Sequence, residues 1–550
     1  MVSLVEVVVV VVVLSWLRLA EGARGADHDD EVLKHCHFTR YPGRCWQALV
    51  AELDESHRSS KQQLVGDHLG QISVLSALVR KTISETNLPS SHFTILDSRM
   101  EISQARRAQS ASEYCKNLTG MSLQSLGQSL SALRNSPTKR KHDIQTWLSS
   151  VLTFHQACAD SIHHSLSTAD AASHISRKTS YLSQLISNAL SLANRITSSD
   201  HSHSANKTST SSGSGAGFPE WVSMKNRKLL QGGGGVIIRA NAVVAKDGTG
   251  NYETISAAIA AAPGRSRFVI YVKAGVYNEK IHTNKDGITL VGDGKYATVI
   301  VGRDSVNGGS TMPGSATFTI TGDGFIARDI GFQNTAGPAG EQAVALYAAS
   351  DHSVFYRCSM TGYQDTLYAL ALALRQFYRE CDISGTIDFI FGNAAAVFQN
   401  CNILLRRPRP GNSNVVFANG RTDPGQTTGF SLQASRISAA SDLAPVKSNF
   451  DCYLGRPWKQ YSRAVVMQSS IDPTISSKGW AEWPGQGSFS KTLYFGEFSN
   501  SGPGAGMSGR VKWAGFHALG PQEAAKFTVG NFIAGSSWLP STGVTFIAGL

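Results

Sequence analysis

Val354-Phe355-Tyr356-Arg357-Cys358-Ser359-Met360 is the stretch that decides the fold, because three other segments of the chain echo it. Each echo begins with an apolar or aromatic pair, continues through polar residues and ends on an apolar residue; the three are residues 325–330, 377–383 and 397–403. Phe355, Phe377 and Phe398 are 22 and 21 residues apart, which is the length of one coil in a β-solenoid. A sandwich of short strands gives no reason for this period, so the sequence predicts a right-handed parallel β-helix.

The predicted all-β region extends over residues 240–550. Short β-branched runs alternate there with Gly, Asn and Asp, as in Phe268–Val272 and Ile288–Gly292, which is typical of strands separated by turns. Four cysteines of this region could stack as free core thiols or form disulfides, and the sequence leaves both open: Cys358, Cys381, Cys401 and Cys452.

Residues 31–197 have a different texture, because Gly and Pro are scarce and apolar residues recur at spacings of three and four. One such stripe consists of Leu64, Leu69, Ile72, Leu75, Leu78 and Val79. A second helical pattern, residues 143–148, follows a polar break at Pro137. Four helices of this kind would form a bundle, so we expect two domains: an all-α four-helix bundle followed by the all-β solenoid.

An apolar run at the N-terminus, residues 7–14, is too short for a comfortable membrane span. Small residues follow it up to Ala26, as expected near a signal-peptidase site, although Glu6 precedes it in place of Lys or Arg. We interpret residues 1–26 as a signal peptide, with an uncleaved signal anchor as the alternative. Two N-glycosylation sequons, at Asn117 and Asn206, agree with secretion.

Residues 198–231 form a linker that begins with Ser, Thr, His and Gly and contains few apolar residues in its first half, so it cannot bury a core. It ends with Arg227-Lys228-Leu229-Leu230, followed by Gln231. Paired bases in an exposed linker are accessible to a processing protease. We therefore expect cleavage near Gln231, which would separate a helical pro-region from the solenoid.

The net charge of the chain is +11 and its pI is about 9.2. A basic balance suits a polyanionic partner such as a nucleic acid, an acidic polysaccharide or a membrane surface. No nucleic-acid motif is visible, which favours an acidic polysaccharide; improved solubility is the alternative explanation of the charge. None of the eight cysteines forms a C-x-x-C pair, which disfavours zinc and thioredoxin-like sites.

Two aspartates, Asp365 and Asp388, stand among apolar and aromatic residues, and Gln342 and Gln364 precede them closely in sequence. A carboxylate with such neighbours is poorly solvated, so its pKa tends to rise. Two such groups in one pocket can hold different protonation states and divide acid and nucleophile roles between them. The alternative is that each aspartate only caps a turn between strands.

Five patches together resemble the signature regions of pectin methylesterases, in the order found in that family: residues 275–279, 342–346, 362–368, 385–392 and 454–458. The resemblance covers residues 240–550. Residues 31–197 are similar to the plant invertase and pectin methylesterase inhibitor family, through the segments 36–45 and 146–158. This second resemblance implies two disulfides, one between Cys36 and Cys45 and one between Cys115 and Cys158.

The resemblance implies a cell-wall carboxylic ester hydrolase that removes methyl groups from polygalacturonan (pectin) and releases methanol. Asp388 would be the nucleophile and Asp365 the general acid and then the base, while Gln342 and Gln364 would donate hydrogen bonds to the oxyanion. Arg456 would pair with Asp388, lower its pKa and, with Gln342, also contact the substrate. No metal or organic cofactor is implied. We expect the protein to be a monomer. Its expected partners are pectin, the processing protease, and either its own pro-region or a separate inhibitor protein.

Aromatic residues near the two acids are candidates for binding sugar rings. Trp458 would form part of the sugar platform, and Tyr363, Tyr368 and Phe391 are further candidates, with core packing as the alternative. Thr311 is a candidate contact as well.

The chain departs from the family pattern at two places. Residues 369–374 read Ala-Leu-Ala-Leu-Ala-Leu, where the family usually has a shorter polar turn, so Asp365 and Asp388 are 23 residues apart. If the extra residues bulge outward, the register of the coils is kept; otherwise the two carboxylates are misplaced. Met312 stands where a substrate-contacting Thr is common in the family.

Rival functions are disfavoured by specific residues. A serine esterase would need a Gly-x-Ser-x-Gly elbow, which is absent from the sequence. A pectin lyase would need a calcium-binding cluster of acids, and a polygalacturonase paired acids without the glutamine donors. The alternative from another class is a catalytically weak pectin-binding protein whose helical domain inhibits an esterase.

Overall fold

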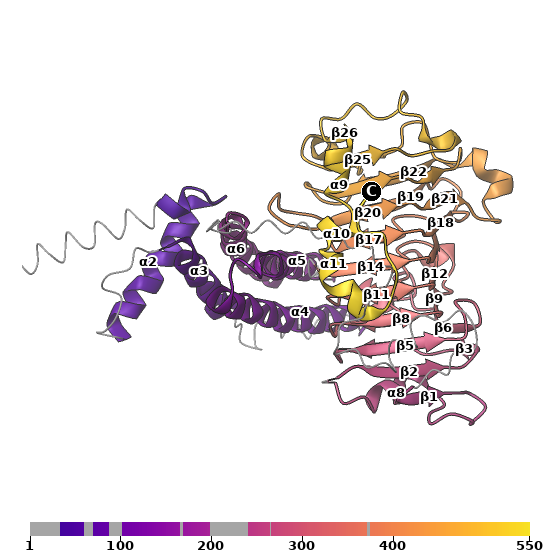
Figure 1. Ribbon diagram of the computed structural model, residues 1–550, viewed down its shortest axis with the longest axis horizontal. Helices are drawn as coiled ribbons and strands as arrows, with labels where there is room; N and C mark the ends of the chain where they lie inside the picture. The colour runs from indigo at the N-terminus through magenta and orange to yellow at the C-terminus, as the bar shows by residue number, and fades with distance from the viewer. Residues whose placement is uncertain are drawn as a thin grey trace, which may run out of the picture.

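The computed structural model describes residues 34–59, 70–86, 102–165, 169–197, 240–264, 266–370 and 374–550. These residues form a helical bundle and a long solenoid of stacked strands, and the bundle lies against one side of the solenoid (Figure 1). The predicted fold class is therefore confirmed. The predicted signal peptide and the predicted linker, which includes Asn206 and the dibasic cleavage site, lie outside the described residues.

Three sheets, named A, B and C here, form the walls of the solenoid. In the described part of the chain, the neighbouring strands of each sheet pair in parallel and are separated in sequence by roughly one coil. The chain passes from a strand of sheet A to one of sheet B and then to one of sheet C before it returns to sheet A. This is a parallel β-helix, as the repeat predicts.

The strands of each sheet follow one another along the solenoid. Sheet A contains β1 (Ala242–Val244), β2 (Phe268–Val272), β5 (Ile288–Gly292), β8 (Ile326–Arg328), β11 (Ser353–Tyr356), β14 (Arg375–Arg379), β17 (Ala395–Gln399), β20 (Gly429–Gln433), β23 (Arg463–Met467), β25 (Tyr494–Phe498) and β26 (Phe516–Ala518). Sheet B contains β3 (Gly275–Tyr277), β6 (Thr298–Gly302), β9 (Gly331–Asn334), β12 (Ser359–Thr361), β15 (Asp382–Gly385), β18 (Asn402–Leu405), β21 (Arg436–Ala439) and β24 (Ser470–Ile471). Sheet C contains β4 (Ile281–Thr283), β7 (Phe318–Ile320), β10 (Leu346–Ala348), β13 (Leu367–Ala369), β16 (Ile390–Gly392), β19 (Asn414–Asn419) and β22 (Cys452–Pro457).

An aromatic ladder runs through the core, and in one of its coils the ladder residue is the neighbour of the one that the sequence repeat predicts. Phe355 pairs with Tyr378, and Tyr378 pairs with Phe398; their rings stack with centroids 4.8 and 4.6 Å apart. Phe377, which the sequence repeat equated with Phe355, pairs instead with Val354 and Val397. Because side chains alternate between the two faces of a strand, this shift of one residue places Phe377 on the other face of sheet A.

Four buried cysteines of the solenoid are free thiols rather than disulfides: Cys358, Cys381, Cys401 and Cys452. Two of them donate hydrogen bonds to carbonyl oxygens of the preceding coil, Cys381 to Phe355 and Cys401 to Tyr378. This settles the choice that the sequence left open.

The helical part of the described chain contains α2 (Pro42–Ser59), α3 (Gln71–Thr86), α4 (Ile102–Asn135), α5 (Lys141–Ser165) and α6 (Ala169–Asn194). Helices α3 to α6 contact one another in a closed arrangement, and α2 packs on α3 and α6. The predicted count of four helices is therefore not confirmed. Both predicted disulfides are present, between Cys36 and Cys45 and between Cys115 and Cys158. Within the described ranges, no helix combines the length and the apolar character that a membrane span requires.

Short helices complete the solenoid. Helix α8 (Ile255–Ala260) lies near its first strands, and residues after β26 pack through Phe527, Phe532 and Trp538 on the outer face of sheet A. The other short helices are α9 (Pro521–Ala525), α10 (Val529–Phe532), α11 (Gly535–Trp538) and the 3-10 turns η2 (Pro313–Ser315), η3 (Pro338–Gly340), η4 (Ala444–Asn449), η5 (Gly487–Lys491), η6 (Pro503–Ala505) and η7 (Leu539–Thr542).

The unusual segment 369–374 leaves the register of the coils intact. On its N-terminal side, Leu367, Tyr368 and Ala369 pair with consecutive residues of β16, and on its C-terminal side β14 pairs residue by residue with β17. Residues 371–373 lie outside the described ranges. The extra length therefore does not displace the strands that follow Asp365 and Asp388.

Candidate active site

Asp365 and Asp388 occupy equivalent positions on adjacent coils. Each lies in the turn from sheet B to sheet C, two residues before the paired residues Leu367 and Ile390. The backbone N–H of Asp365 donates to the carbonyl of Ile387 at 3.0 Å, which ties the two turns together. Since neighbouring strands lie about 4.8 Å apart, stacking brings the two carboxylates into one site.

Both aspartates adopt a left-handed backbone conformation, with φ of 60° at Asp365 and 50° at Asp388. This conformation costs an ordinary L-residue about 1–2 kcal/mol, and Asp and Asn tolerate it best after Gly. Both side chains are buried, at 8% and 6% exposure. The fold thus holds two carboxylates in left-handed turns and away from solvent.

Arg456, on β22, reaches back along sheet C to Asp388. Its Nε and Nη2 donate to the two carboxylate oxygens of Asp388 at 2.9 and 2.6 Å, which is the bidentate geometry of a strong ion pair. Ala418 lies between Phe391 and Arg456 in the same row of the sheet, and this small residue leaves room for the guanidinium to cross. The ring of Trp483 lies 4.3 Å from the same guanidinium and holds it from the other side.

The two carboxyl groups differ in electrostatics because only one has this partner. Burial, together with the charge of Asp388, raises the pKa of Asp365 well above its ordinary value, and Arg456 offsets only part of that rise. Burial also raises the pKa of Asp388, and Arg456 lowers it again without cancelling the rise. The structure therefore contains both predicted influences on the pKa of Asp388, the lowering by Arg456 and the raising by burial, and burial is the larger of the two.

Gln364 directly precedes Asp365 in the same turn, Gln342 lies in the turn of the preceding coil, and both line the same pocket as the two acids. The side-chain oxygen of Gln342 is buried and has no hydrogen-bond partner among the described residues. Buried polar atoms are nearly always hydrogen-bonded in folded proteins, so this oxygen is placed to accept a hydrogen bond from a ligand, whereas the amide nitrogen is the end that can donate one.

The pocket that joins these residues has a volume of about 450 Å³. Of the residues singled out from the sequence, the following line it: Gln342, Gln364, Asp365, Asp388, Arg456, Trp458, Tyr368, Phe391, Thr311 and Met312. The rings of Tyr368 and Phe391 stack 4.4 Å apart, and Trp458 meets Phe391 edge-on at 6.1 Å. The floor of the pocket is therefore a row of aromatic rings beside the carboxylates.

Tyr363 is the one candidate aromatic residue that this pocket does not include. Its hydroxyl accepts a hydrogen bond from Arg406 Nη2 at 2.6 Å, and the same guanidinium lies 3.8 Å from its ring. Trp483 is the converse case, because it lines the pocket although it was not among the candidate contacts named from the sequence. Its place over Arg456 depends on a contact between neighbouring coils, which sequence spacing alone does not reveal.

The helical bundle forms the opposite wall of the pocket, through Arg107, Tyr114, Ala157, Asp160 and Ser161. Three polar contacts join the two walls. Ser110 and Thr311 lie 3.3 Å apart through their hydroxyls, the hydroxyl of Tyr347 donates to that of Tyr114 at 3.4 Å, and Lys459 Nζ donates to Asp160 at 2.9 Å. An apolar cluster that includes Phe154 and the Cys115–Cys158 disulfide continues the contact across sheet C. The bundle thus covers the site.

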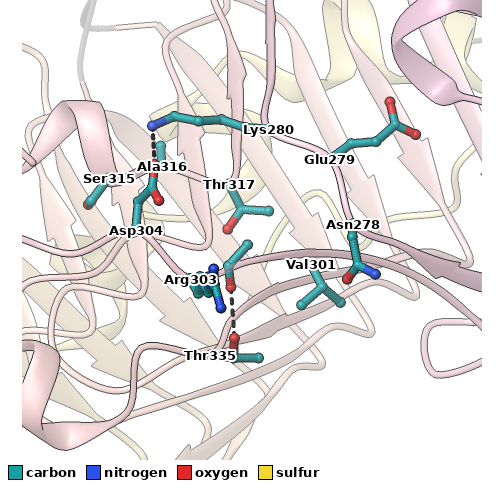
Figure 2. Close-up of a pocket in the computed structure, with 11 residues that line it drawn as sticks. Asn278, Glu279, Lys280, Val301, Arg303, Asp304, Ser315, Ala316, Thr317 and Thr335 are labelled. Carbon is teal, nitrogen blue, oxygen red and sulfur yellow. Dashed lines mark hydrogen bonds and ion pairs between the residues drawn. The ribbon is translucent and has the colours of Figure 1, made fainter. Parts of the chain in front are cut away.

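A second pocket, of about 490 Å³, lies at the same corner of the solenoid near earlier coils (Figure 2). Its one lysine, Lys280, is already paired with Asp304, and Thr335 donates to the carbonyl of Gly302. None of the candidate catalytic residues lines it. The reaction centre is therefore assigned to the first pocket.

Two buried carboxyl groups, one arginine and two amides lie together on a parallel β-helix, an arrangement that suits the hydrolysis of a carbohydrate ester. Comparison with known families matches residues 241–536 to Pectinesterase and residues 30–192 to Plant invertase/pectin methylesterase inhibitor. The chain belongs to the pectinesterase family and is a carboxylic ester hydrolase that removes methyl groups from pectin.

Individual relatives agree with this assignment. The chain is 47% identical to a probable pectinesterase/pectinesterase inhibitor of Arabidopsis thaliana, over 91% of this chain and 90% of the relative. It is 45% identical to a pectinesterase of Citrus sinensis, over 95% of each chain. Among solved structures, a pectin methylesterase from carrot superposes with a TM-score of 0.56 at 52% identity, covering 58% of this chain and 100% of that one.

Proposed function

We propose that Asp388 is the nucleophile that attacks the carbonyl carbon of a pectin methyl ester, and that Asp365 is the general acid and base. The observation that carries this assignment is the bidentate pair between Arg456 and Asp388, beside a second carboxyl group that lacks an ion-pair partner within the described residues. A guanidinium keeps its partner ionised and oriented for attack. A buried carboxyl without a cation stays protonated and can give up its proton.

The reaction then proceeds in two balanced halves. An Asp388 oxygen adds to the ester carbonyl, the bond to the methoxy oxygen breaks, and Asp365 donates its proton so that methanol leaves. The result is an anhydride between Asp388 and the C6 carboxyl of the sugar. Asp365, now a carboxylate, takes a proton from water as the water attacks the anhydride, which releases the free acid and restores both side chains.

Gln342 and Gln364 are proposed as donors to the oxyanion that forms in each half. Neutral amides stabilise a developing negative charge without lowering the reactivity of the nucleophile, and such a donor contributes about 3–4 kcal/mol to barrier lowering. Tyr368, Phe391 and Trp458 are proposed as the surface on which the sugar rings lie, because they form the floor of the pocket.

The test is methanol release from esterified pectin by a chain that begins at Gln231, since the whole of the carrot structure matches the solenoid region of this chain. We expect activity in this chain and a loss of at least about 10⁴-fold in kcat for Asp388→Asn, with unchanged pectin binding and circular dichroism. Full activity of Asp388→Asn would remove it from the nucleophile role. The pectin-binding alternative predicts instead that neither chain releases methanol.

The helical bundle is proposed to act as an internal inhibitor, because it covers the pocket that holds the catalytic groups. Cleavage at Arg227-Lys228-Leu229-Leu230 by a processing protease would leave the solenoid as a monomeric enzyme. We further propose that the chain is secreted to the cell wall and that residues 1–26 are removed. Glycosylation is proposed at Asn206 and at Asn117, which is exposed on α4. Methanol release by the uncleaved chain at the rate of the cleaved one would contradict the inhibitory role.

A further inference from the structure

Three ion pairs cross from the helical part to the solenoid in the described residues, and one of them differs from the other two. Arg40 pairs with Asp423 at 2.7 Å, Asp143 with Arg375 at 2.7 Å, and Asp160 with Lys459 at 2.9 Å. Only the last brings a bundle carboxylate that lines the catalytic pocket to a cation of the solenoid. Of the three pairs, that between Asp160 and Lys459 is therefore the one placed to affect substrate binding.

The solenoid partners of the other two pairs also take part in its own folding. Arg375 donates to both carboxylate oxygens of Asp351, and Asp423 accepts the backbone N–H of Gly425. Lys459 has no such role: within the described chain, its ammonium group pairs with no carboxylate of the solenoid. Once the bundle leaves, this lysine is a cation without a counter-ion.

The position of Lys459 makes this cation part of the sugar-binding surface. It follows Trp458 directly, and its Nζ lies 5.4 Å from the centre of the Trp458 ring. Its side chain is 23% exposed even with the bundle in place. Arg456, the other cation at this edge, already has both carboxylate oxygens of Asp388 on its guanidinium. A negative charge on the substrate near Trp458 would therefore meet Lys459.

We propose that Lys459 binds a free uronate carboxylate of partly de-esterified pectin, next to the sugar whose ester is being cleaved, and that Asp160 of the bundle occupies the same place before processing. The inference rests on the proposed function and adds to it a preference for partly de-esterified substrate. Because one ammonium group serves both carboxylates, an acidic polymer and the bundle exclude each other at this position. The enzyme should favour substrate that already carries acid groups, which are its own product.

The experiment uses the chain beginning at Gln231 and compares Lys459→Gln, Lys459→Arg and the parent on two oligogalacturonates, one fully methyl-esterified and one about half esterified. Lys459→Gln should raise KM for the half-esterified substrate about fivefold, the contribution of one partly exposed ion pair, with kcat changed less than twofold. KM for the fully esterified substrate should change less than twofold. Lys459→Arg should restore the parent KM, and the inhibition constant of polygalacturonate should rise with Lys459→Gln by the same factor.

A matched control is Lys512→Gln, which removes one positive charge from an exposed lysine whose Nζ donates only to the carbonyl of Ser508. It should leave both KM values unchanged. An equal rise of KM on both substrates would overturn the proposal, because it would mean that Lys459 only holds the Trp458 ring in place. No rise of KM on either substrate would also overturn it, because Lys459 would then not contact the substrate. A parent chain that releases no methanol would instead refute the proposed function, so the two failures are distinguishable.

Discussion

The turns that carry Asp365 and Asp388 are alike in backbone and differ in one contact. Both have a left-handed φ, both are buried and both precede paired strands of sheet C by two residues. Only Asp388 holds a cation, and that cation comes from β22, 68 residues further along the chain. The comparison shows that a solenoid can generate two equivalent carboxyl groups by repetition and then make their electrostatic surroundings differ with a single residue from two coils further along.

The largest expected effect is at these two turns themselves. Asp388→Asn removes the nucleophile and should lower kcat by at least about 10⁴-fold, whereas Asp365→Asn removes only proton transfer and should cost about 10²–10⁴-fold. The double variant should be no slower than Asp388→Asn alone, since the two groups act in one sequence of steps. Methanol release under single-turnover conditions measures all three; a greater loss for Asp365→Asn would reverse the proposed roles.

The oxyanion donors should give the next largest effect. Gln342→Ala and Gln364→Ala are each expected to lower kcat about 10²–10³-fold with little change in KM, because an oxyanion exists only after attack. Tyr363→Phe is the matched control, since Tyr363 adjoins Gln364 in sequence but contacts Arg406 instead of the pocket. A loss of activity in Tyr363→Phe as large as that at Gln364 would return Tyr363 to the site.

Removing the cation should make the two turns electrostatically more alike. Arg456 lowers the pKa of Asp388, so Arg456→Gln should raise that pKa further. The nucleophile is active when ionised, and its activity is lost as the pH falls through its pKa. The acid limb of the kcat/KM profile should therefore move to higher pH in the variant. An acid limb that stays in place would show that another group controls it.

The smallest effect concerns the backbone of the same turns. Alanine is less tolerant than asparagine of the left-handed conformation, so Asp365→Ala should be about 1 kcal/mol less stable than Asp365→Asn. The same difference is expected between Asp388→Ala and Asp388→Asn. Urea unfolding of the four variants measures it, and equal stabilities within each pair would mean that the turns relax without strain.

Local patterns in the sequence were sufficient to predict the structural features that repeat from coil to coil. The period near 22 residues predicted the solenoid, and the motif residues around Asp365 and Asp388 meet in one pocket. The period could not fix the register to the residue, because Phe377 and Tyr378 are both aromatic and only packing decides which one faces inward. Trp483 and Lys459 reach the site from later coils, and no spacing in the sequence encodes such contacts.

The balance of influences on the pKa of Asp388 needed the structure for a different reason. The sequence predicted both burial, which raises this pKa, and the arginine, which lowers it, but not the wall that the bundle adds opposite them; in the structure burial is the larger influence. Likewise, the sequence left open whether the segment 369–374 displaces the carboxylates, because its length was visible and the pairing of its flanking strands was not. The strands on both of its sides keep their partners.

The bundle and the site it covers belong to one polypeptide, and this shifts the binding equilibrium between them. As long as residues 197 and 240 remain joined, the bundle faces the groove at an effective concentration on the order of millimolar, so even weak contacts suffice to hold it there. The proposed cleavage of one peptide bond would convert that intramolecular equilibrium into a bimolecular one. Dilution would then favour release of the bundle from the groove, without any change in the contacts themselves.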